Sequence, residues 1–325
     1  MLQIEQNNLL IESTLTERIF SNTFKSLDRI VSDFDFTTYH LSSIENKTKI
    51  LISINLKCWN DLAQYGVTQI LSEKYQPFSS VLSTTDAEQG YNYSFILDLE
   101  SAFDQDQDFK LSLINELSLL KRNSMAAPFC AAFSRYDELF KKYANVNTYS
   151  EEVQMELQNE KVIIIKYRGL NESIYLKPSF DRVTIIFSTM FQDETDKIFG
   201  KVFLQEFVDA RKRSVQTAPQ VLYNTEAPLD IANDVKKGEH FVTFVLFPRH
   251  LTIGDKRENC ISHIQLFRSY FHYHIKCSKA YMHSRMRFRV KEFLKILNRA
   301  KPENLDDDGK VIETRKTASG RTFVK

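Results

Sequence analysis

Residues 255–300 read DKRENCISHIQLFRSYFHYHIKCSKAYMHSRMRFRVKEFLKILNRA, and this stretch contains neither Gly nor Pro. Apolar or small side chains recur along it at steps of three or four residues: Cys260, Ile264, Phe267, Phe271, Ile275, Ser278, Met282, Met286, Val290, Phe293 and Leu297. This spacing predicts a helix with one apolar face, called the apolar stripe below. At about 1.5 Å per residue the helix would measure roughly 68 Å, more than a small domain. We therefore expect a second polypeptide to cover part of the stripe.

Positive charge is concentrated in the same stretch. The whole chain is nearly neutral, with 43 Lys and Arg against 42 Asp and Glu and a formal net charge of +1. Between residues 276 and 301, nine basic residues stand against the single acid Glu292: Lys276, Lys279, Arg285, Arg287, Arg289, Lys291, Lys295, Arg299 and Lys301. Lys291, Lys295 and Arg299 recur every four residues, so they form one ridge on the helix. A smaller basic cluster consists of Arg211, Lys212 and Arg213.

Two functions are compatible with a helix that is both apolar and basic. The helix can pair with a partner helix while its basic flank meets an acidic protein surface, as in a scaffold. Alternatively, it can lie on nucleic acid, as in an adaptor protein, which predicts a basic domain overall. Residues 91–160 hold twelve acids against six bases, which would repel DNA and favours the scaffold.

The rest of the chain predicts a mixture of helices and strands. Helical spacing of apolar residues occurs within residues 8–24, 58–70, 113–142 and 198–210. Alternation predicts strands at residues 49–56, 91–99, 162–167, 183–189, 219–223 and 241–247. In the first of these, Ile50, Ile52 and Ile54 share the apolar face, whereas Ser53 and Asn55 share the face exposed to solvent. Half-polar strands favour antiparallel sheets. The predicted fold class is α+β, with two units joined near residues 144–159 and a long C-terminal helix.

Candidate metal ligands do not form a convincing site. His272 and His274 point about 200° apart on a helix, so they cannot grip one ion, and His274 with Cys277 supplies only two ligands. The acidic run with Asp at positions 104, 106 and 108 imitates the start of a calcium loop, but Phe109 replaces the Gly of its sharp turn. We therefore predict no metal site.

Motifs for catalysis and cofactor binding are also missing. The pair Gly200-Lys201 lacks the upstream Gly of a phosphate-binding loop, and neither a nucleophile elbow nor a dinucleotide fingerprint occurs. We therefore predict no catalytic residue and no cofactor, although isolated acids, serines and histidines can still assemble a catalytic site in space, so missing motifs disfavour an enzyme without excluding one.

The cysteines and the apolar runs indicate a compartment. Four cysteines stand singly in the sequence, which predicts reduced thiols: Cys58, Cys130, Cys260 and Cys277. No apolar run approaches the roughly 18 residues that span a bilayer, and the start of the chain lacks the basic and apolar regions of a signal peptide. We expect a soluble intracellular protein without membrane insertion.

Long blocks of the sequence resemble one known family. These blocks are DRVTIIFST at residues 181–189, GKVFLQEF at 200–207, TAPQVL at 217–222, FVTFVLFPRH at 241–250 and YHIKCSKAY at 273–281. KILISI at residues 49–54 and LKRN at 120–123 are similar as well. Together they resemble the subunit 2 family of the actin-related protein 2/3 complex along essentially the whole chain.

The resemblance implies a fold and a set of partners. It implies two α/β sandwich units with largely antiparallel sheets, at residues 1–148 and 149–254, a long helix at 255–301 and a polar tail at 302–325. It also implies a non-enzymatic core subunit that pairs with subunit 4, contacts actin-related proteins 2 and 3 and the other subunits, and rests on the mother actin filament while a branch is nucleated. The implied location is the cytoplasm and the actin cytoskeleton, including cortical actin patches, with roles in endocytosis and cell motility. Nucleic acid is not an expected partner.

The resemblance and the helix pattern together suggest two sets of site residues. The partner interface, facing subunit 4 and the chain's own sheet, is expected to include Phe267, Phe271, Ile275, Met282, Met286, Phe293 and Leu297. Filament contacts are expected from Arg287, Lys291, Lys295, Arg299 and Lys301, and less strongly from Arg211, Lys212 and Arg213.

Overall fold

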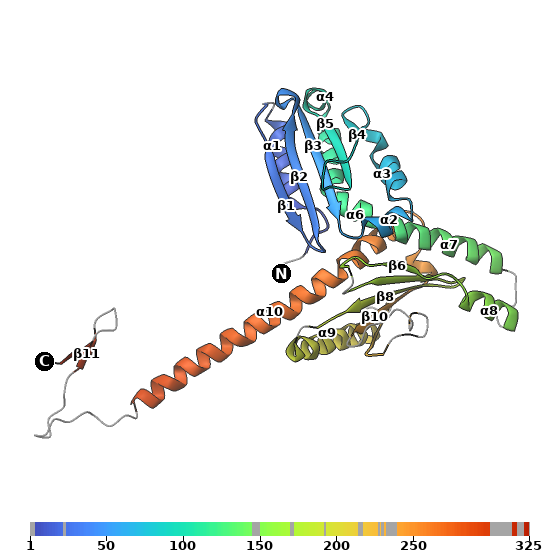
Figure 1. Ribbon diagram of the computed structural model, residues 1–325. Helices are drawn as coiled ribbons and strands as arrows, with labels where there is room; N and C mark the ends of the chain where they lie inside the picture. The colour runs from blue at the N-terminus through green and yellow to red at the C-terminus, as the bar shows by residue number, and fades with distance from the viewer. Residues whose placement is uncertain are drawn as a thin grey trace, which may run out of the picture. The chain divides into compact units, whose positions relative to one another are not determined.

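The structure, a computed structural model, describes residues 4–21, 24–144, 150–169, 172–191, 193–213, 217–226, 228, 231, 239–299, 314–316 and 322–324. The chain forms two compact units, Met1–Tyr273 and His274–Lys325. The first unit contains two five-stranded antiparallel sheets, and the second contains the later part of a long helix (Figure 1). The predicted α+β class is therefore confirmed. The predicted boundary near residue 148 stays a prediction.

The first sheet has the strand order β1-β2-β3-β5-β4, and every neighbouring pair is antiparallel. Its strands are β1 (Asp28–Asp33), β2 (Thr37–Ile44), β3 (Lys49–Leu56), β4 (Leu82–Thr85) and β5 (Tyr93–Asp98). Strand β3 has the predicted bounds, and Ile50, Ile52 and Ile54 are buried on its core face. The alternation of the sequence thus identified the face that the helices cover.

The opposite face of this sheet is less wet than the alternation predicted. Ser53 is fully buried and its Oγ lies 2.9 Å from Oγ of Ser94 on β5. The backbone N–H of Glu88 donates to Ser94 Oγ at 3.0 Å, and Asn55 Nδ2 donates to the carbonyl of Gly90 at 2.5 Å. The loop between β4 and β5 therefore folds over this face, which local alternation could not indicate.

The helices of the first part of the chain are α1 (Leu9–Phe20), α2 (Trp59–Ala63), α3 (Val67–Tyr75), α4 (Leu99–Phe103), α5 (Gln107–Ser118), α6 (Leu120–Met125), α7 (Ala127–Tyr143) and α8 (Glu151–Gln158), with 3₁₀ turns η1 (Glu45–Lys47) and η2 (Gln76–Phe78). They lie on the core face of this sheet up to α6, whereas α7 packs on strands of the second sheet. Helix α1 buries Ile11, Leu15 and Ile19, and the Asn8 side chain caps its start. The predicted helix over residues 58–70 is split between α2, which ends at Ala63, and α3, which begins after Gly66, whose φ is 75°.

The second sheet repeats the antiparallel arrangement with the order β6-β7-β8-β10-β9. Its strands are β6 (Ile163–Ile165), β7 (Ile174–Pro178), β8 (Val183–Thr189), β9 (Gln220–Asn224) and β10 (His240–Leu246), and η4 (Pro248–His250) follows. Helix α9 (Glu194–Arg213) lies along one side of this sheet (Figure 1). Strand β8 has the bounds that the sequence predicted.

Helix α10 (Asp255–Arg299) begins in the first unit, and its first part is anchored there by aromatic packing. The Phe267 ring centroid lies 4.6 Å from that of Phe244 on β10 and 5.4 Å from that of Phe187 on β8. One turn later, Phe271 packs 5.7 Å from Phe203 on α9. These contacts fix α10 on the second sheet.

Buried polar contacts fix the same part of α10 to elements that follow the first sheet. Arg122 on α6 is 8% exposed; its Nη2 lies 2.7 Å from Glu258 Oε2 and its Nε donates to Ser262 Oγ at 2.9 Å. On α7, Asp137 pairs with Arg257. Leaving the buried Arg122 guanidinium without its partners would be costly, so its contacts stabilise the position of α10.

A third polar cluster centres on Glu172, which is 3% exposed. Its Oε2 lies 2.9 Å from Arg168 Nε and 2.8 Å from Arg268 Nη2 on α10, and its Oε1 accepts from Thr189 Oγ1 at 3.0 Å. Burial disfavours the charged form of Arg268, but Glu172 outweighs it and raises the pKa of this guanidinium. Arg168 Nη1 also lies 3.0 Å from Asp35 Oδ1, so the cluster connects α10 with the turn between β1 and β2.

The second unit contains residues of α10 from His274 to Arg299 and two short strands, β11 (Thr314–Lys316) and β12 (Thr322–Val324), which pair antiparallel. The tail predicted as polar contains these two strands. Among the helices described, α10 included, none carries an apolar stretch long enough to cross a bilayer.

Candidate partner-binding surface on helix α10

The apolar stripe changes its environment along α10. Its first predicted interface residues are buried: Phe267 is 8%, Phe271 1% and Ile275 2% exposed. Phe267 and Phe271 reach this burial by packing on the chain's own second sheet and on α9. They contribute to the core of the first unit, which leaves the later part of the stripe for other contacts.

The later part of the stripe is exposed. The four remaining predicted interface residues are Met282, Met286, Phe293 and Leu297, with exposed fractions of 43%, 56%, 60% and 48%. Val290 on the stripe and Leu294 beside it are more than half exposed as well. Because large apolar side chains in water are unfavourable, a row of this length typically marks a protein interface.

Basic side chains border this row. A shallow, open groove along α10, formed by this helix alone, is lined by Met286, Val290 and Leu294 together with Arg287 and Lys291. Lys295 also belongs to the groove, and its Nζ lies 2.9 Å from Glu292 Oε1 one turn earlier. A partner in the groove would therefore meet apolar contacts in the middle and positive charge at the edge.

The predicted filament residues form a ridge of exposed cations on α10. Arg287, Lys291, Lys295 and Arg299 follow one another at intervals of four residues, and all four are exposed. Lys301 lies outside the described residues. Fewer acidic than basic side chains lie along this part of α10, so the ridge has a positive potential that attracts an acidic surface.

The second basic cluster is at the end of α9. The Nε of Arg211 donates to the carbonyl of Ala218 at 3.2 Å, so this residue also has a local structural contact. Lys212 and Arg213 are exposed. The structure brings these residues together as consecutive positions of one helix end.

Sequence reasoning missed a second group of exposed apolar residues on α10. Tyr281, Phe288 and Ile296 are 60%, 58% and 61% exposed, and they recur at steps of seven and eight residues. The Arg285 guanidinium stacks on the Tyr281 ring at 5.6 Å and donates to its hydroxyl at 2.8 Å. The helical spacing of these three residues in the sequence could have identified this second apolar face, but the longer apolar stripe was the more evident pattern.

The histidines and aspartates weighed as metal ligands have other surroundings. His272 Nε2 lies 3.0 Å from Thr189 Oγ1, and Asp106 Oδ1 accepts from the backbone N–H of Phe109 at 2.7 Å, which caps α5. In the part of the chain that the structure describes, no group of three or more His, Cys, Asp or Glu side chains is arranged to hold a metal ion. The four cysteines are free thiols.

Fold and surface together define the class of this protein. It is an α+β protein with two antiparallel sheets whose terminal helix displays an apolar stripe beside a ridge of cations, as in subunits that assemble through helices. The sequence model of the family described as "Arp2/3 complex, 34 kD subunit p34-Arc" matches residues 52–304. The chain belongs to this family.

Two curated relatives agree with this assignment. The "Actin-related protein 2/3 complex subunit 2" of Schizosaccharomyces pombe is 46% identical over 331 residues and covers all of both chains. The protein of the same name from Dictyostelium discoideum is 31% identical over 329 residues, covering 99% of each chain. The expected resemblance is thus confirmed over the whole length.

Proposed function

We propose that this chain is a scaffold subunit of an Arp2/3 complex that nucleates branched actin filaments, and that it has no catalytic role of its own. Its partners would be subunit 4, the actin-related proteins 2 and 3, the other subunits and the mother actin filament. Family membership supports the complex, and the exposed apolar stripe with its bordering cations supports binding to partners. The stripe is the single observation that carries the proposal.

Subunit 4 is proposed to cover the later part of the stripe. Full burial of a Met, Val, Leu or Phe side chain contributes roughly 1.5–3 kcal/mol. Association costs about 4–15 kcal/mol in lost translational and rotational freedom, and only the surplus above this cost gives net affinity. The four predicted residues, Val290 and Leu294 are about half exposed, so each can contribute about half of that gain, and the six together contribute about 5–9 kcal/mol, which falls within this cost. A single contact falls below it. A long, continuous contact with a partner helix is therefore favoured over a point contact.

Co-expression with subunit 4 tests this proposal. Met286→Asp places a charge within the groove and should prevent co-purification, because a carboxylate would be buried among apolar side chains. Ser284→Asp adds the same charge two residues earlier, at an exposed position off the stripe, and should leave co-purification intact. Normal heterodimer yield with Met286→Asp would show that the stripe is not the interface.

The ridge formed by Arg287, Lys291, Lys295 and Arg299 is proposed to contact the mother filament, together with Lys301 and more weakly with the Arg211–Arg213 cluster. Attraction between exposed charges raises association rates and weakens with salt. If the isolated chain instead bound duplex or single-stranded nucleic acid with a steep salt dependence, the adaptor function would replace the scaffold. Filament cosedimentation that needs the other subunits would support the scaffold.

The location follows from these partners. A fluorescent fusion of the full chain should label the actin cytoskeleton in the cytoplasm, including cortical patches at sites of endocytosis. Depolymerising actin should disperse this label. A distribution unaffected by actin depolymerisation would contradict the proposed location.

A further inference from the structure

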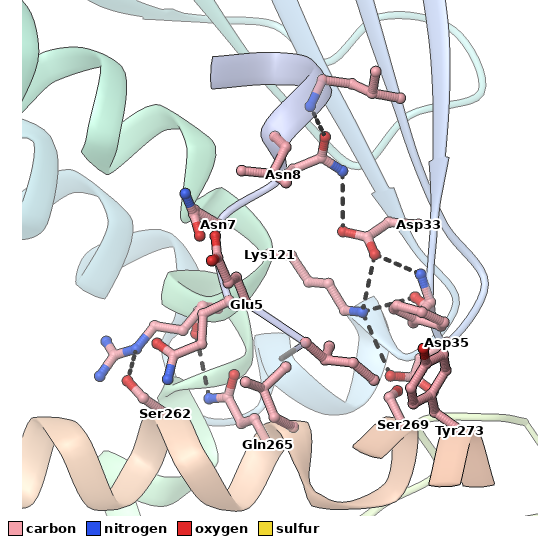
Figure 2. A pocket seen from close by; sticks show the side chains of 17 residues that line it. Glu5, Asn7, Asn8, Asp33, Asp35, Lys121, Ser262, Gln265, Ser269 and Tyr273 are labelled. Atoms are coloured by element: carbon pink, nitrogen blue, oxygen red, sulfur yellow. Dashed lines mark hydrogen bonds and ion pairs between the residues drawn. The ribbon is translucent and has the colours of Figure 1, made fainter. Parts of the chain in front are cut away.

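The first unit contains a cleft of about 750 Å³ that is separate from the surface described above. It lies between the segment before α1, the turn between β1 and β2, helix α6 and the first part of α10 (Figure 2). These elements are far apart in sequence, so the cleft exists only in the folded chain.

The floor of the cleft is an ion cluster. Lys121 Nζ donates to the carbonyl of Phe34 at 2.8 Å, and it lies 3.4 Å from Asp35 Oδ2 and 3.9 Å from Asp33 Oδ1. Asn8 Nδ2 donates to Asp33 Oδ2 at 3.2 Å (Figure 2). Because these groups satisfy one another, the floor needs no ion or small polar ligand.

The rim of the cleft, by contrast, is apolar and exposed. Leu9, Leu10 and Phe34 are 59%, 56% and 52% exposed, and Leu266 and Tyr273 form the wall on α10. Leu9 and Leu10 do not contribute to the core, since α1 packs through Ile11, Leu15 and Ile19. Apolar side chains from separate elements around one cleft are typical of a docking site.

The turn that contains Phe34 has an unfavourable backbone conformation. Asp35 and Phe36 have φ of 60° and 56°, a left-handed conformation that a bulky residue such as Phe rarely adopts. Lys121 and Arg168 hold this turn through the Phe34 carbonyl and the Asp35 carboxylate. Lys57 and Arg168 also stack on the Phe36 ring, at 4.6 and 4.8 Å, whereas the Phe34 ring is 52% exposed. The surrounding structure thus maintains a strained turn, and strained turns cluster at functional sites.

Charge indicates the chemistry of the occupant. Glu5 lines the cleft and is exposed, and among the described residues no ion pair with it is formed. Asp33 and Asp35 below it are paired with Lys121, and Asp35 also with Arg168, so Glu5 is the carboxylate of this lining that has no ion pair among the described residues. The rim is therefore apolar with an acidic edge.

We propose that this cleft binds a segment of a partner polypeptide that inserts apolar side chains between Leu9, Leu10 and Phe34 and places a Lys or Arg beside Glu5. The inference rests on the proposed function, because the partner is another subunit of the same complex. It differs from the α10 interface in its position, in the first unit, and in its charge, which is acidic at the edge.

Photocrosslinking in the assembled complex tests the inference. A benzoylphenylalanine replaces Phe34 in the full chain, and a matched control places it at Ile30 on β1, which is 68% exposed and does not line the cleft. The Phe34 probe should crosslink to one other subunit, next to a Lys or Arg in that subunit, and the Ile30 probe should not. Glu5→Lys should reduce the Phe34 crosslink about tenfold.

Three results would overturn the inference. They are an assembled complex without a Phe34 crosslink, a crosslink to a second copy of this chain, and a Glu5→Lys variant with unchanged crosslinking. In each case the complex still forms, so the proposed function stands. If the chain does not assemble with the other subunits at all, the proposed function and this inference fail together.

Discussion

Arg257 and Asp137 form a two-pronged ion pair: Nη1 and Nη2 of the arginine each lie 2.9 Å from one carboxylate oxygen. The two residues are 120 positions apart, on α10 and α7. The same guanidinium donates to the carbonyl of Leu251 through Nε at 3.0 Å and Nη2 at 2.7 Å. The start of the long helix is thereby fixed to α7 and to the loop before it.

Removing this charge pair should destabilise the first unit. Asp137→Asn should lower the free energy of unfolding by about 2 kcal/mol, because a two-pronged, partly buried hydrogen-bonded pair loses its charge. Urea unfolding followed by circular dichroism measures the change. Asp181→Asn is the control, since the Arg182–Asp181 pair is exposed and should contribute less than about 1 kcal/mol. Equal effects of both variants would contradict the anchoring role.

The stability contributed by His40 should depend on pH. Its Nδ1 lies 2.7 Å from Glu88 and its Nε2 2.9 Å from Asp28. Burial lowers the pKa of this imidazole, but the two carboxylates outweigh burial and raise the pKa above its ordinary value.

A raised pKa means that the folded protein holds the proton more tightly than the unfolded chain. The stabilisation is thus fully present below the unfolded pKa of about 6.5 and is lost as the pH rises through the folded pKa. The difference in unfolding free energy between the natural protein and His40→Gln should shrink from pH 6 to pH 8.5. An NMR titration that places the His40 pKa below 6.5 would refute this prediction.

Gly200 on α9 should not tolerate a methyl group. A Cβ at this position would lie 2.8 Å from Cζ of Phe191 and 3.1 Å from Cζ of Phe271. Gly200→Ala should lower the free energy of unfolding by up to about 2 kcal/mol, because an overpacking cost of about 1–3 kcal/mol outweighs the gain of about 1 kcal/mol in helix propensity. A more stable Ala variant would show that the rings move aside at little cost.

The four thiols should differ widely in reactivity. Burial raises the pKa of Cys58 to about 12 and that of Cys260 to about 11, whereas Cys277 is exposed. At pH 8, Cys58 would be thiolate in about one molecule in ten thousand. Labelling of the native chain with a disulfide reagent should show a fast phase that disappears in Cys277→Ser. A fast phase that persists in this variant would mean that one of the other three thiols reacts as readily as Cys277.

Charge reversal on the ridge should weaken filament binding without affecting assembly. Lys295→Glu with Arg299→Glu should reduce cosedimentation of the complete complex with filaments about tenfold at low salt, and less at high salt. The control reverses Lys25 and Lys161, two exposed lysines of the first unit, by the same total charge. Intact assembly with unchanged binding would exclude the ridge as a filament contact.

Local periodicity determined much of this protein. The alternation in residues 49–56 and 183–189 gave strands with the bounds that β3 and β8 have. The stripe and the absence of Gly and Pro predicted α10 almost to its last residue. Both patterns depend only on neighbours along the chain, which is why the sequence shows them without any knowledge of distant contacts.

Only the tertiary structure decided which parts of these elements are covered. Phe271 and Phe293 occupy the same stripe, yet they are 1% and 60% exposed, because only the first meets the second sheet and α9. The alternation predicts that Ser53 faces solvent, but in the structure the loop between β4 and β5 covers it. Burial depends on contacts between residues that are distant in the sequence. A pattern with a period of two or 3.6 residues shows which face of an element is apolar, but it does not specify which distant residues cover that face.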